Sequence, residues 1–186
     1  YLILESTYGD RLHEKTDPLD QVEKIVNQTV NRGGTILISA FAVGRAQNIL
    51  YYLSQLRQSG RIPNIPIYLD SPMSINATEL LCKYANDHRL TPHQCQQACS
   101  EAIYVKTSDE SKALDNQSIP KIIISASGMM AGGRILHHLK SFGPDPNSTI
   151  LTTGFQAEGT RGAKLLAGKK VIKIHGELVS IKAEVT

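Results

Sequence analysis

The sequence predicts an α/β fold in which a mostly parallel β-sheet is covered by helices on both faces. Four short runs rich in Ile, Leu and Thr, at residues 35–39, 65–69, 121–125 and 149–153, alternate with longer stretches of helical periodicity. Continuous apolar runs of this kind are typical of parallel strands that are buried on both faces. Each run ends at a short loop, and ligands of such sheets bind beyond the carboxyl ends of the strands. We therefore expect the four loops to lie along one edge of the sheet.

Length and composition favour one globular domain. The chain has 186 residues, 41% of them hydrophobic and 20% charged, and no apolar run approaches the roughly 20 residues that cross a bilayer. We expect no membrane association. The formal net charge of +3 is modest, so polyanion binding would be local to a cleft. An odd number of cysteines, three, and the lack of a secretory signal predict a reducing compartment, the cytoplasm.

Both ends of the chain read as strands. Residues 1–4 resemble a strand interior, residues 5–14 are polar and irregular, and residues 179–185 alternate like a strand that stops without a turn. We expect both ends to have been cut out of a larger protein, with the terminal strands belonging to a neighbouring domain.

Helices are expected where apolar residues recur at helical spacing. The first has Asp17 as its N-cap and Pro18 at its first position, and a pair of glycines ends it. The predicted helices lie at residues 17–33, 44–59, 74–86, 91–101, 108–115, 132–141 and 159–166. Two further strands are predicted, a short one at 102–105 and a last sheet strand at 170–175.

An arginine follows three of the four strand loops, where a helix should begin: Arg45, Arg134 and Arg161. Guanidinium groups at such an edge, beside glycines that let backbone N–H groups approach a ligand, suit phosphate oxygens. Each such contact would contribute about 1.5–3 kcal/mol. The alternative is that each is a solvated arginine at a helix start. The shared position at the same end of separate strands favours nucleotides or nucleic acid.

The loop SASGMMAGGR at residues 125–134, which we call the glycine loop, carries the strongest local signal. The hydroxyls of Ser125 and Ser127, the glycines Gly128 and Gly133, and Arg134 lie between a strand and a helix. They can form a nest of N–H donors for a phosphodiester. The loop lacks the Lys-Ser/Thr pair of a P-loop and the G-x-G-x-x-G spacing of dinucleotide sites. The alternative is a tight turn whose glycines serve close packing.

Two carboxylates also follow predicted strands. Glu5 could orient a metal-ligating histidine, because carboxylates behind such ligands fix the imidazole tautomer, or it could cap the next turn. Asp70 and Ser71 precede a proline. They could enter a site, but the favoured interpretation is an N-cap for the next helix.

Histidine and cysteine spacing predicts no metal site in this chain. The six histidines form no H-x-H, H-x-x-E-H or His-Asp-His pattern, and a catalytic zinc needs at least three protein ligands. His93, Cys95 and Cys99 are metal-capable. However, the two cysteines fit one helix face, where free cysteine usually behaves as a small apolar residue. His137 follows the glycine loop by one helical turn, so it faces either the cleft or solvent.

Five segments in order, ESTYGDRLHE, AFAVGRAQ, YLDSPMS, ISASGMMAGGRILHHL and GFQAEGTRG, resemble the β-CASP subgroup of metallo-β-lactamase-fold nucleases. That subgroup includes the RNase J enzymes and the 73-kDa cleavage and polyadenylation specificity factor subunit, whose prokaryotic relatives are the most similar. The resemblance runs from Leu2 to about Thr186. It implies a Rossmann-like β-CASP domain at residues 9–186, which caps a metallo-β-lactamase half to which residues 1–8 belong.

The resemblance also implies chemistry. The parent enzyme would hydrolyse RNA phosphodiester bonds with a zinc-bound hydroxide, using two zinc ions. The family's zinc ligands are not present in this chain, which is therefore expected to be inactive alone and to hold no cofactor. Glu5 carries over as the glutamate of the family's motif A. His175 superficially resembles a later motif histidine but is not assigned as a metal ligand.

By this resemblance the chain would supply the RNA-facing wall beside the metallo-β-lactamase half. Seven residues are expected to contact the sugar-phosphate backbone of single-stranded RNA: Arg45, Ser125, Ser127, Gly128, Gly133, Arg134 and Arg161. The loops carry few aromatic residues, Phe41 and Phe155, which favours binding through the backbone over binding through bases. Two alternatives stay open, a free-standing mononucleotide-binding module and a docking domain for a protein partner.

Overall fold

A six-stranded parallel sheet forms the centre of the protein. The computed structural model describes residues 1–10, 12 and 15–186. The sheet has the order β3-β2-β4-β1-β5-β8, and every neighbouring pair is parallel. Its strands are β1 (Thr35–Ser39), β2 (Ile67–Asp70), β3 (Ile103–Tyr104), β4 (Lys121–Ser125), β5 (Thr149–Thr152) and β8 (Glu184–Val185).

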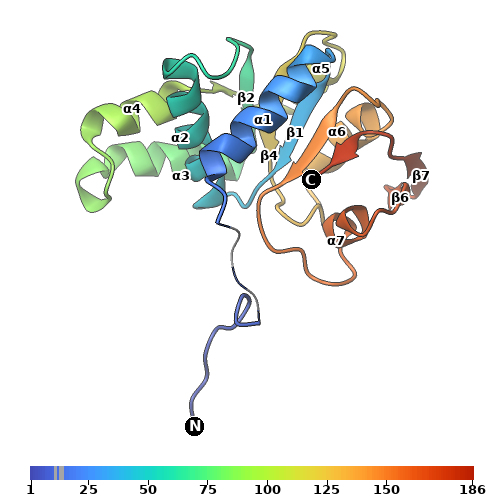
Figure 1. The fold of residues 1–186 in the computed structure, drawn as a ribbon, viewed down its shortest axis with the longest axis horizontal. Helices are drawn as coiled ribbons and strands as arrows, with labels where there is room; N and C mark the ends of the chain where they lie inside the picture. The colour runs from blue at the N-terminus through green and yellow to red at the C-terminus, as the bar shows by residue number, and fades with distance from the viewer. Residues whose placement is uncertain (11, 13–14) are drawn as a thin grey trace.

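Helices cover both faces of this sheet (Figure 1). One face packs against α1 (Pro18–Asn31) and α2 (Arg45–Gln58). The other packs against α5 (Ser108–Asp115), α6 (Ile135–Phe142) and α7 (Arg161–Leu166). The predicted fold class, a mostly parallel sheet with helices on both faces, is confirmed.

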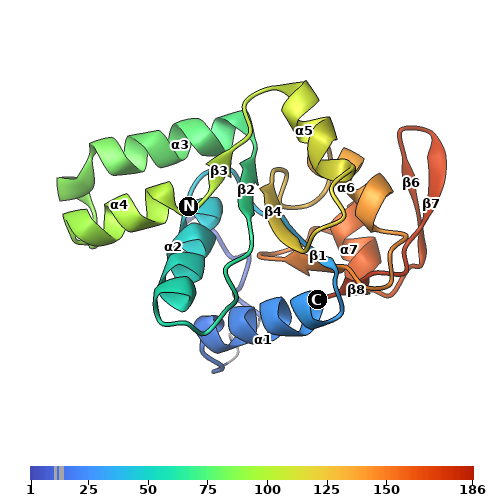
Figure 2. The same cartoon turned by 90° about the horizontal axis from the view of Figure 1, so that it is seen from above.

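A helical hairpin lies beside one edge of the sheet. It consists of α3 (Pro72–Lys83), a short 3₁₀ turn η1 (Ala85–Asp87) and α4 (Pro92–Ser100). Figure 2 shows α3 and α4 side by side and extending away from the strands.

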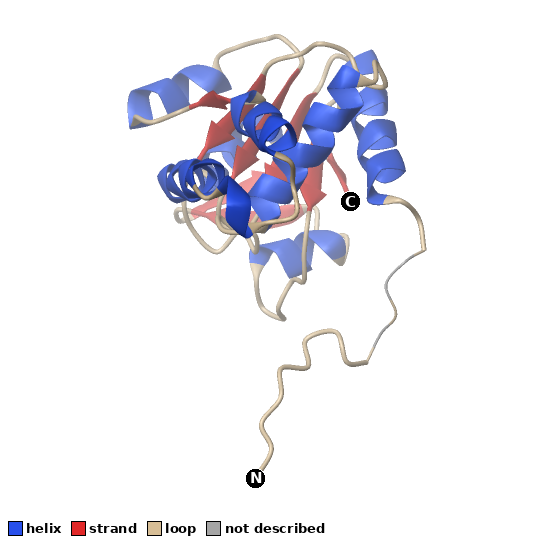
Figure 3. Cartoon of the chain, turned by 90° about the vertical axis from the view of Figure 1, so that its left-hand side faces the viewer, coloured by secondary structure: helices blue, strands red, loops and turns tan. Residues whose placement is uncertain are grey.

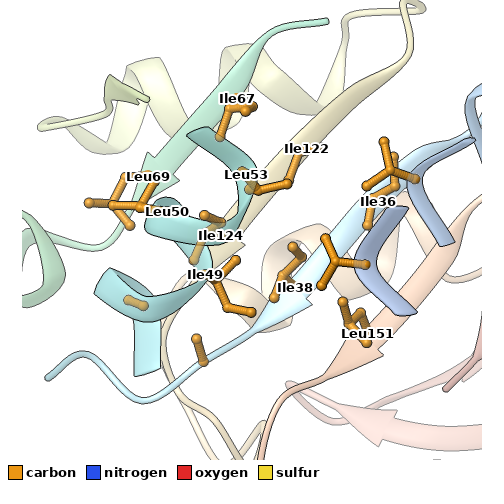
Figure 4. Close-up of a cluster of buried hydrophobic side chains, with 14 of the residues drawn as sticks. Ile36, Ile38, Ile49, Leu50, Leu53, Ile67, Leu69, Ile122, Ile124 and Leu151 are labelled. Atoms are coloured by element: carbon orange, nitrogen blue, oxygen red, sulfur yellow. The ribbon is translucent and has the colours of Figure 1, made fainter. Parts of the chain in front are cut away.

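The two core clusters follow from the alternation of side chains along each strand. Ile36 and Ile38 of β1 join the cluster under α1 and α2, which Figure 4 shows, whereas Leu37 joins the cluster on the opposite face. β4 repeats the pattern, with Ile122 and Ile124 on the first face. A strand buried on both faces therefore needs an unbroken apolar run, which is what its sequence shows.

Local caps place the helix starts. The Asp17 carboxylate accepts a hydrogen bond of 2.9 Å from the backbone N–H of Leu19, and the Ser71 hydroxyl accepts one of 3.2 Å from that of Ser74. The predicted cap role of Ser71 is thus confirmed. The helix predicted at 132–141 begins later, at Ile135, because Gly133 has φ +82°, which no right-handed helix allows.

Residues 1–4, predicted as a strand that belongs to a neighbouring domain, form no strand within this chain. Residues 1–6 have no regular structure, and their side chains are exposed. A strand is stable only beside a second strand, and in Figures 1 and 3 this segment extends away from the sheet. Of the irregular segment predicted at 5–14, residues 11, 13 and 14 lie outside the described residues.

The predictions for the C-terminal strands need correction. Residues 170–175 do not extend the main sheet: β6 (Val171–Ile174) pairs antiparallel with β7 (Glu177–Ser180) in a separate hairpin. His175 (φ +48°) and Gly176 (φ +86°) both adopt positive φ, as a two-residue hairpin turn requires. The segment predicted as one strand at 179–185 is split between β7 and β8.

No helix among the described residues has the length and apolar character needed to span a membrane.

Candidate nucleic-acid interface at the carboxyl edge of the sheet

The carboxyl ends of the four long strands lie in one row. Ser39 of β1 is in register with Ser125 of β4 and with Thr152 of β5, and Ser125 is in register with Asp70 of β2. The loops that follow these strands therefore leave the sheet at the same edge, as the sequence predicted.

Close packing holds these loops together. Gly128 is buried beneath Phe41, and a Cβ atom at this position would lie 2.9 Å from Phe41 Cδ2 and 3.0 Å from the Phe41 backbone nitrogen. Gln156 Nε2 donates to the Gly128 carbonyl oxygen at 2.8 Å. Gly128 thus serves loop packing, the alternative considered for this segment, and being buried it is shielded from a ligand.

A buried charge network centres on Asp70. Its Oδ1 accepts a hydrogen bond of 2.7 Å from Arg134 Nη1, and its Oδ2 lies 2.6 Å from His138 Nε2 and 2.5 Å from the Ser111 hydroxyl. On the other side of the imidazole, His138 Nδ1 lies 2.6 Å from Asp115 Oδ1. Asp70 is therefore a buried structural anchor rather than a helix cap.

The network favours the charged forms of both Asp70 and His138. Burial alone would raise the pKa of Asp70, but hydrogen bonds from His138, Ser111 and Arg134 outweigh burial and lower this pKa. Burial alone would lower the pKa of His138, but hydrogen bonds to Asp115 and Asp70 outweigh it and raise this pKa. Sequence reasoning missed His138; the only signal was its place in the His137-His138 pair on the helix after the glycine loop.

Arg134 has a different environment from the one predicted. Besides the ion pair with Asp70, its Nη1 and Nη2 donate at 3.0 Å to the carbonyl oxygens of Val105 and Lys106. The expectation of a guanidinium open to phosphate is wrong here, because a buried carboxylate needs a charged partner and Arg134 provides it.

Arg161 is likewise engaged by backbone. Its Nε donates to the Lys173 carbonyl oxygen at 2.8 Å, and its Nη1 donates to the carbonyl oxygens of Met130 at 3.3 Å and Ala131 at 3.1 Å. These bonds tie the glycine loop to β6. Arg161 also lines a groove of about 810 Å³ with Lys164 and Lys173.

Arg45 faces a different groove, of about 990 Å³, which we call the Arg45 groove. It lies between α1 and the loop after β5, and its lining includes Lys24, Thr153 and Phe155. Arg45 is exposed, and its side chain forms no hydrogen bond or ion pair with the described residues. Glu184, also in the lining, is ion-paired with Arg32 at 2.7 Å.

Two aromatic residues, Tyr8 and Phe155, line the Arg45 groove together with Arg45 and Lys24. The rings of Tyr8 and Phe155 meet edge to face with centroids 6.3 Å apart, and the Phe155 backbone N–H donates to Tyr8 Oη at 3.1 Å. Positive charge beside aromatic faces suits a phosphate followed by a base.

The three arginines do not share one groove, although the loops that carry them share one edge. Arg45 lines one groove, Arg161 lines another, and Arg134 lines neither of the two.

The remaining predicted residues are Ser125, Ser127, Gly133 and Glu5, and their environments differ. Ser125 is buried, and its hydroxyl donates to the Asp70 carbonyl oxygen at 2.9 Å, so its predicted RNA contact does not fit the structure. Ser127 Oγ accepts from the Ala131 N–H at 3.1 Å, and Gly133 is exposed. Glu5 is exposed and accepts a hydrogen bond of 2.6 Å from the Thr7 N–H. Its pKa is lowered by hydrogen bonds to Thr7, as in the turn-capping alternative.

Among the described residues, one cluster of three metal-capable side chains occurs, formed by Cys82, Cys95 and Cys99. It lies in the α3–α4 hairpin and not in the loops of this edge.

Comparison with known proteins identifies a family model and several relatives whose sequences are similar to this chain. A family model described as the Beta-Casp domain matches residues 46–165. Ribonuclease TTHA0252 of Thermus thermophilus is 37% identical over 192 residues, which cover 99% of this chain and 44% of that protein. An RNase J-like protein of Methanocaldococcus jannaschii is 36% identical over 191 residues, with the same coverage of 99% and 44%.

A third relative is named for a role in transcription. The transcription termination factor FttA of Thermococcus kodakarensis is 36% identical over 189 residues, which cover 95% of this chain and 28% of that protein. The chain thus spans less than half the length of these relatives. Because the family model matches most of the chain, the protein belongs to the β-CASP family.

Proposed function

We propose that this chain is the RNA-binding cap of a zinc-dependent RNA nuclease. The names of two relatives, a ribonuclease and an RNase J-like protein, support RNA as the substrate class. The observation that carries the proposal is the Arg45 groove, because it places an exposed guanidinium, without a partner among the described residues, at the carboxyl edge of a parallel sheet. Ligands of open α/β sheets bind at this edge.

In this proposal the three arginines have separate tasks. Arg45 and Lys24 contact successive phosphates, and Phe155 offers a ring on which a base can stack. Arg134 and Arg161 instead fix the glycine loop, through Asp70 and through backbone carbonyl groups. Ser127 and Gly133 stay candidates for phosphate contacts from that loop.

The catalytic metals would come from a metallo-β-lactamase half of the same protein. We propose that residues 1–8 belong to that half and residues 9–186 to the β-CASP domain. Support comes from Leu2, Ile3 and Leu4, which are 82%, 94% and 71% exposed and would gain burial against such a neighbour. Two zinc ions bound there would supply the hydroxide that attacks phosphorus. The chain alone would then be inactive, in the reducing setting of the cytoplasm.

Binding of single-stranded RNA at several salt concentrations tests the proposal. Arg45→Ala should weaken binding roughly tenfold to a hundredfold. It should also reduce the slope of log affinity against log salt by about 0.7, the value for one phosphate contact on a single strand. Lys169→Ala is the matched control, because it removes one exposed positive charge that lines neither groove.

Three other results would contradict the proposal. Equal losses in the two variants would reject the Arg45 groove as the RNA path. Selective binding of one mononucleotide with a shallow salt slope would favour the nucleotide-binding module instead. A chain carrying both halves and two zinc ions that left RNA intact would reject the nuclease assignment.

A further inference from the structure

Four metal-capable side chains meet in the α3–α4 hairpin. Cys82 lies near the end of α3, His88 follows the η1 turn, and Cys95 and Cys99 lie one turn apart on α4. The three sulfur atoms lie within 4.8 Å of one another. His88 Nε2 lies 3.5 Å from Cys95 Sγ.

The separation between His88 Nε2 and Cys95 Sγ fits a tetrahedral zinc ion, and the sulfurs of Cys82 and Cys99 would reach the spacing of zinc ligands once their disulfide is reduced. With Zn–S bonds of about 2.3 Å and Zn–N bonds of about 2.0–2.1 Å, tetrahedral angles place two sulfurs roughly 3.8 Å apart and sulfur and nitrogen roughly 3.5 Å apart. Cys₃His is a common ligand set of structural zinc sites, which are closed and four-coordinate. His88 Nε2, now 3.1 Å from the Leu81 carbonyl oxygen, would exchange that contact for the metal.

The far half of the hairpin has little apolar core of its own. The buried residues of α3, Ser74, Ile75 and Thr78, all lie in its first two turns, and only Cys95 and Ala98 are buried in α4. Apolar side chains near the tip stay largely in solvent, with Leu80 at 55% and Tyr84 at 51% exposure. Small elements that lack a core commonly depend on a bound metal or a disulfide for order.

The structure joins Cys82 and Cys99 in a disulfide and leaves Cys95 as a buried free thiol. The Cα atoms of Cys82 and Cys99 are 6.6 Å apart, near the upper end of the range of about 4.4–6.8 Å for disulfide-bonded cysteines. A disulfide uses two of the four donors and gives no role to Cys95 and His88. Stable disulfides are also rare in a reducing compartment, the setting proposed for this chain.

We propose that Cys82, His88, Cys95 and Cys99 together bind one structural Zn²⁺ that joins α3 to α4. The site does not depend on the proposed nuclease function, since all four ligands come from residues 82–99 of this chain. A metal here would hold the hairpin tip in place of an apolar core.

Metal analysis of protein purified under reducing conditions tests the proposal. Wild-type protein should contain about one zinc ion per chain more than Cys95→Ser protein, as expected for a single closed site. His88→Asn should also lower the zinc content, whereas His93→Asn, its exposed neighbour on α4, should leave it unchanged. Differences between variants are used, so metal bound elsewhere in a longer protein cancels.

A spectroscopic readout and a thiol count make the result independent of folding defects in the variants. Co²⁺ added to reduced wild-type protein should give the intense visible bands of a tetrahedral thiolate site, and Zn²⁺ should abolish them. After denaturation with a chelator but no reductant, the zinc protein should show three reactive thiols, because none is oxidised. One reactive thiol, no cobalt bands and equal zinc in wild-type and Cys95→Ser protein would overturn the proposal and leave the Cys82–Cys99 disulfide.

Discussion

His138 Nε2 lies 2.6 Å from Asp70 Oδ2, and both side chains are completely buried. Asp70 ends β2 at the carboxyl edge of the sheet, and His138 lies on the helix that follows the glycine loop. Because Arg134 binds the other oxygen of the same carboxylate, the position of the glycine loop depends on this buried cluster.

Loss of the imidazole should strongly destabilise the fold. His138→Gln removes one charged partner of buried Asp70, and breaking a buried pair costs about 3–5 kcal/mol of unfolding free energy. Urea denaturation measures the change. His137→Gln is the control, since that neighbouring histidine is exposed and its loss should change the unfolding free energy by about 0.5 kcal/mol or less. Similar losses in both variants would contradict the central role of His138.

The stability of the protein should fall as the pH rises above neutrality. The pKa of His138 is raised by its two aspartates, so the folded state retains a proton that the unfolded state has released. The contribution of His138 is complete below about pH 6.5, its pKa in the unfolded chain, and is lost as the pH rises through the higher folded pKa. Unfolding free energies of wild-type and His138→Gln protein, measured at increasing pH from about 6.5 upward, should therefore converge. A gap that widened with pH would contradict the raised pKa.

Arg134→Ala should impair folding more than RNA binding. The variant leaves the Asp70 carboxylate without its guanidinium partner, at a cost of about 3 kcal/mol of unfolding free energy. Per folded molecule, RNA affinity should match that of wild-type protein. Arg45→Ala should show the reverse pattern, with normal stability and weaker binding. Weak RNA binding by a fully stable Arg134→Ala protein would restore the phosphate-contact interpretation of Arg134.

Gly128→Ala should disturb the contact between the loops. Its Cβ would meet Phe41, including that residue's backbone nitrogen at 3.0 Å, so either Phe41 or the glycine loop must move. Overpacking of this kind costs about 1–3 kcal/mol, measured by denaturation. Gly132→Ala is the matched control in the same loop, because a Cβ there meets no atom within 4 Å. A neutral Gly128→Ala variant would show that this packing is not needed.

Much of the architecture could be predicted from short stretches of sequence. β1 and β4 were recognisable because strands buried on both faces need continuous apolar runs. Helix starts were recognisable because caps such as Asp17 and Ser71 act within three residues. The shared edge of the loops follows from parallel strand topology. Residues 1–4 form no strand here, because a strand pattern is stable only beside a partner strand.

The roles of the polar side chains were decided only by the tertiary structure. Asp70 meets Arg134 across 64 positions of sequence and His138 across 68, and no local pattern indicates such a partner. Local sequence therefore determined the strands, the helix starts and the common edge of the loops. Three-dimensional packing decided that Arg134 joins a buried carboxylate while Arg45 stays in solvent, because burial makes an unpaired charge costly and exposure does not.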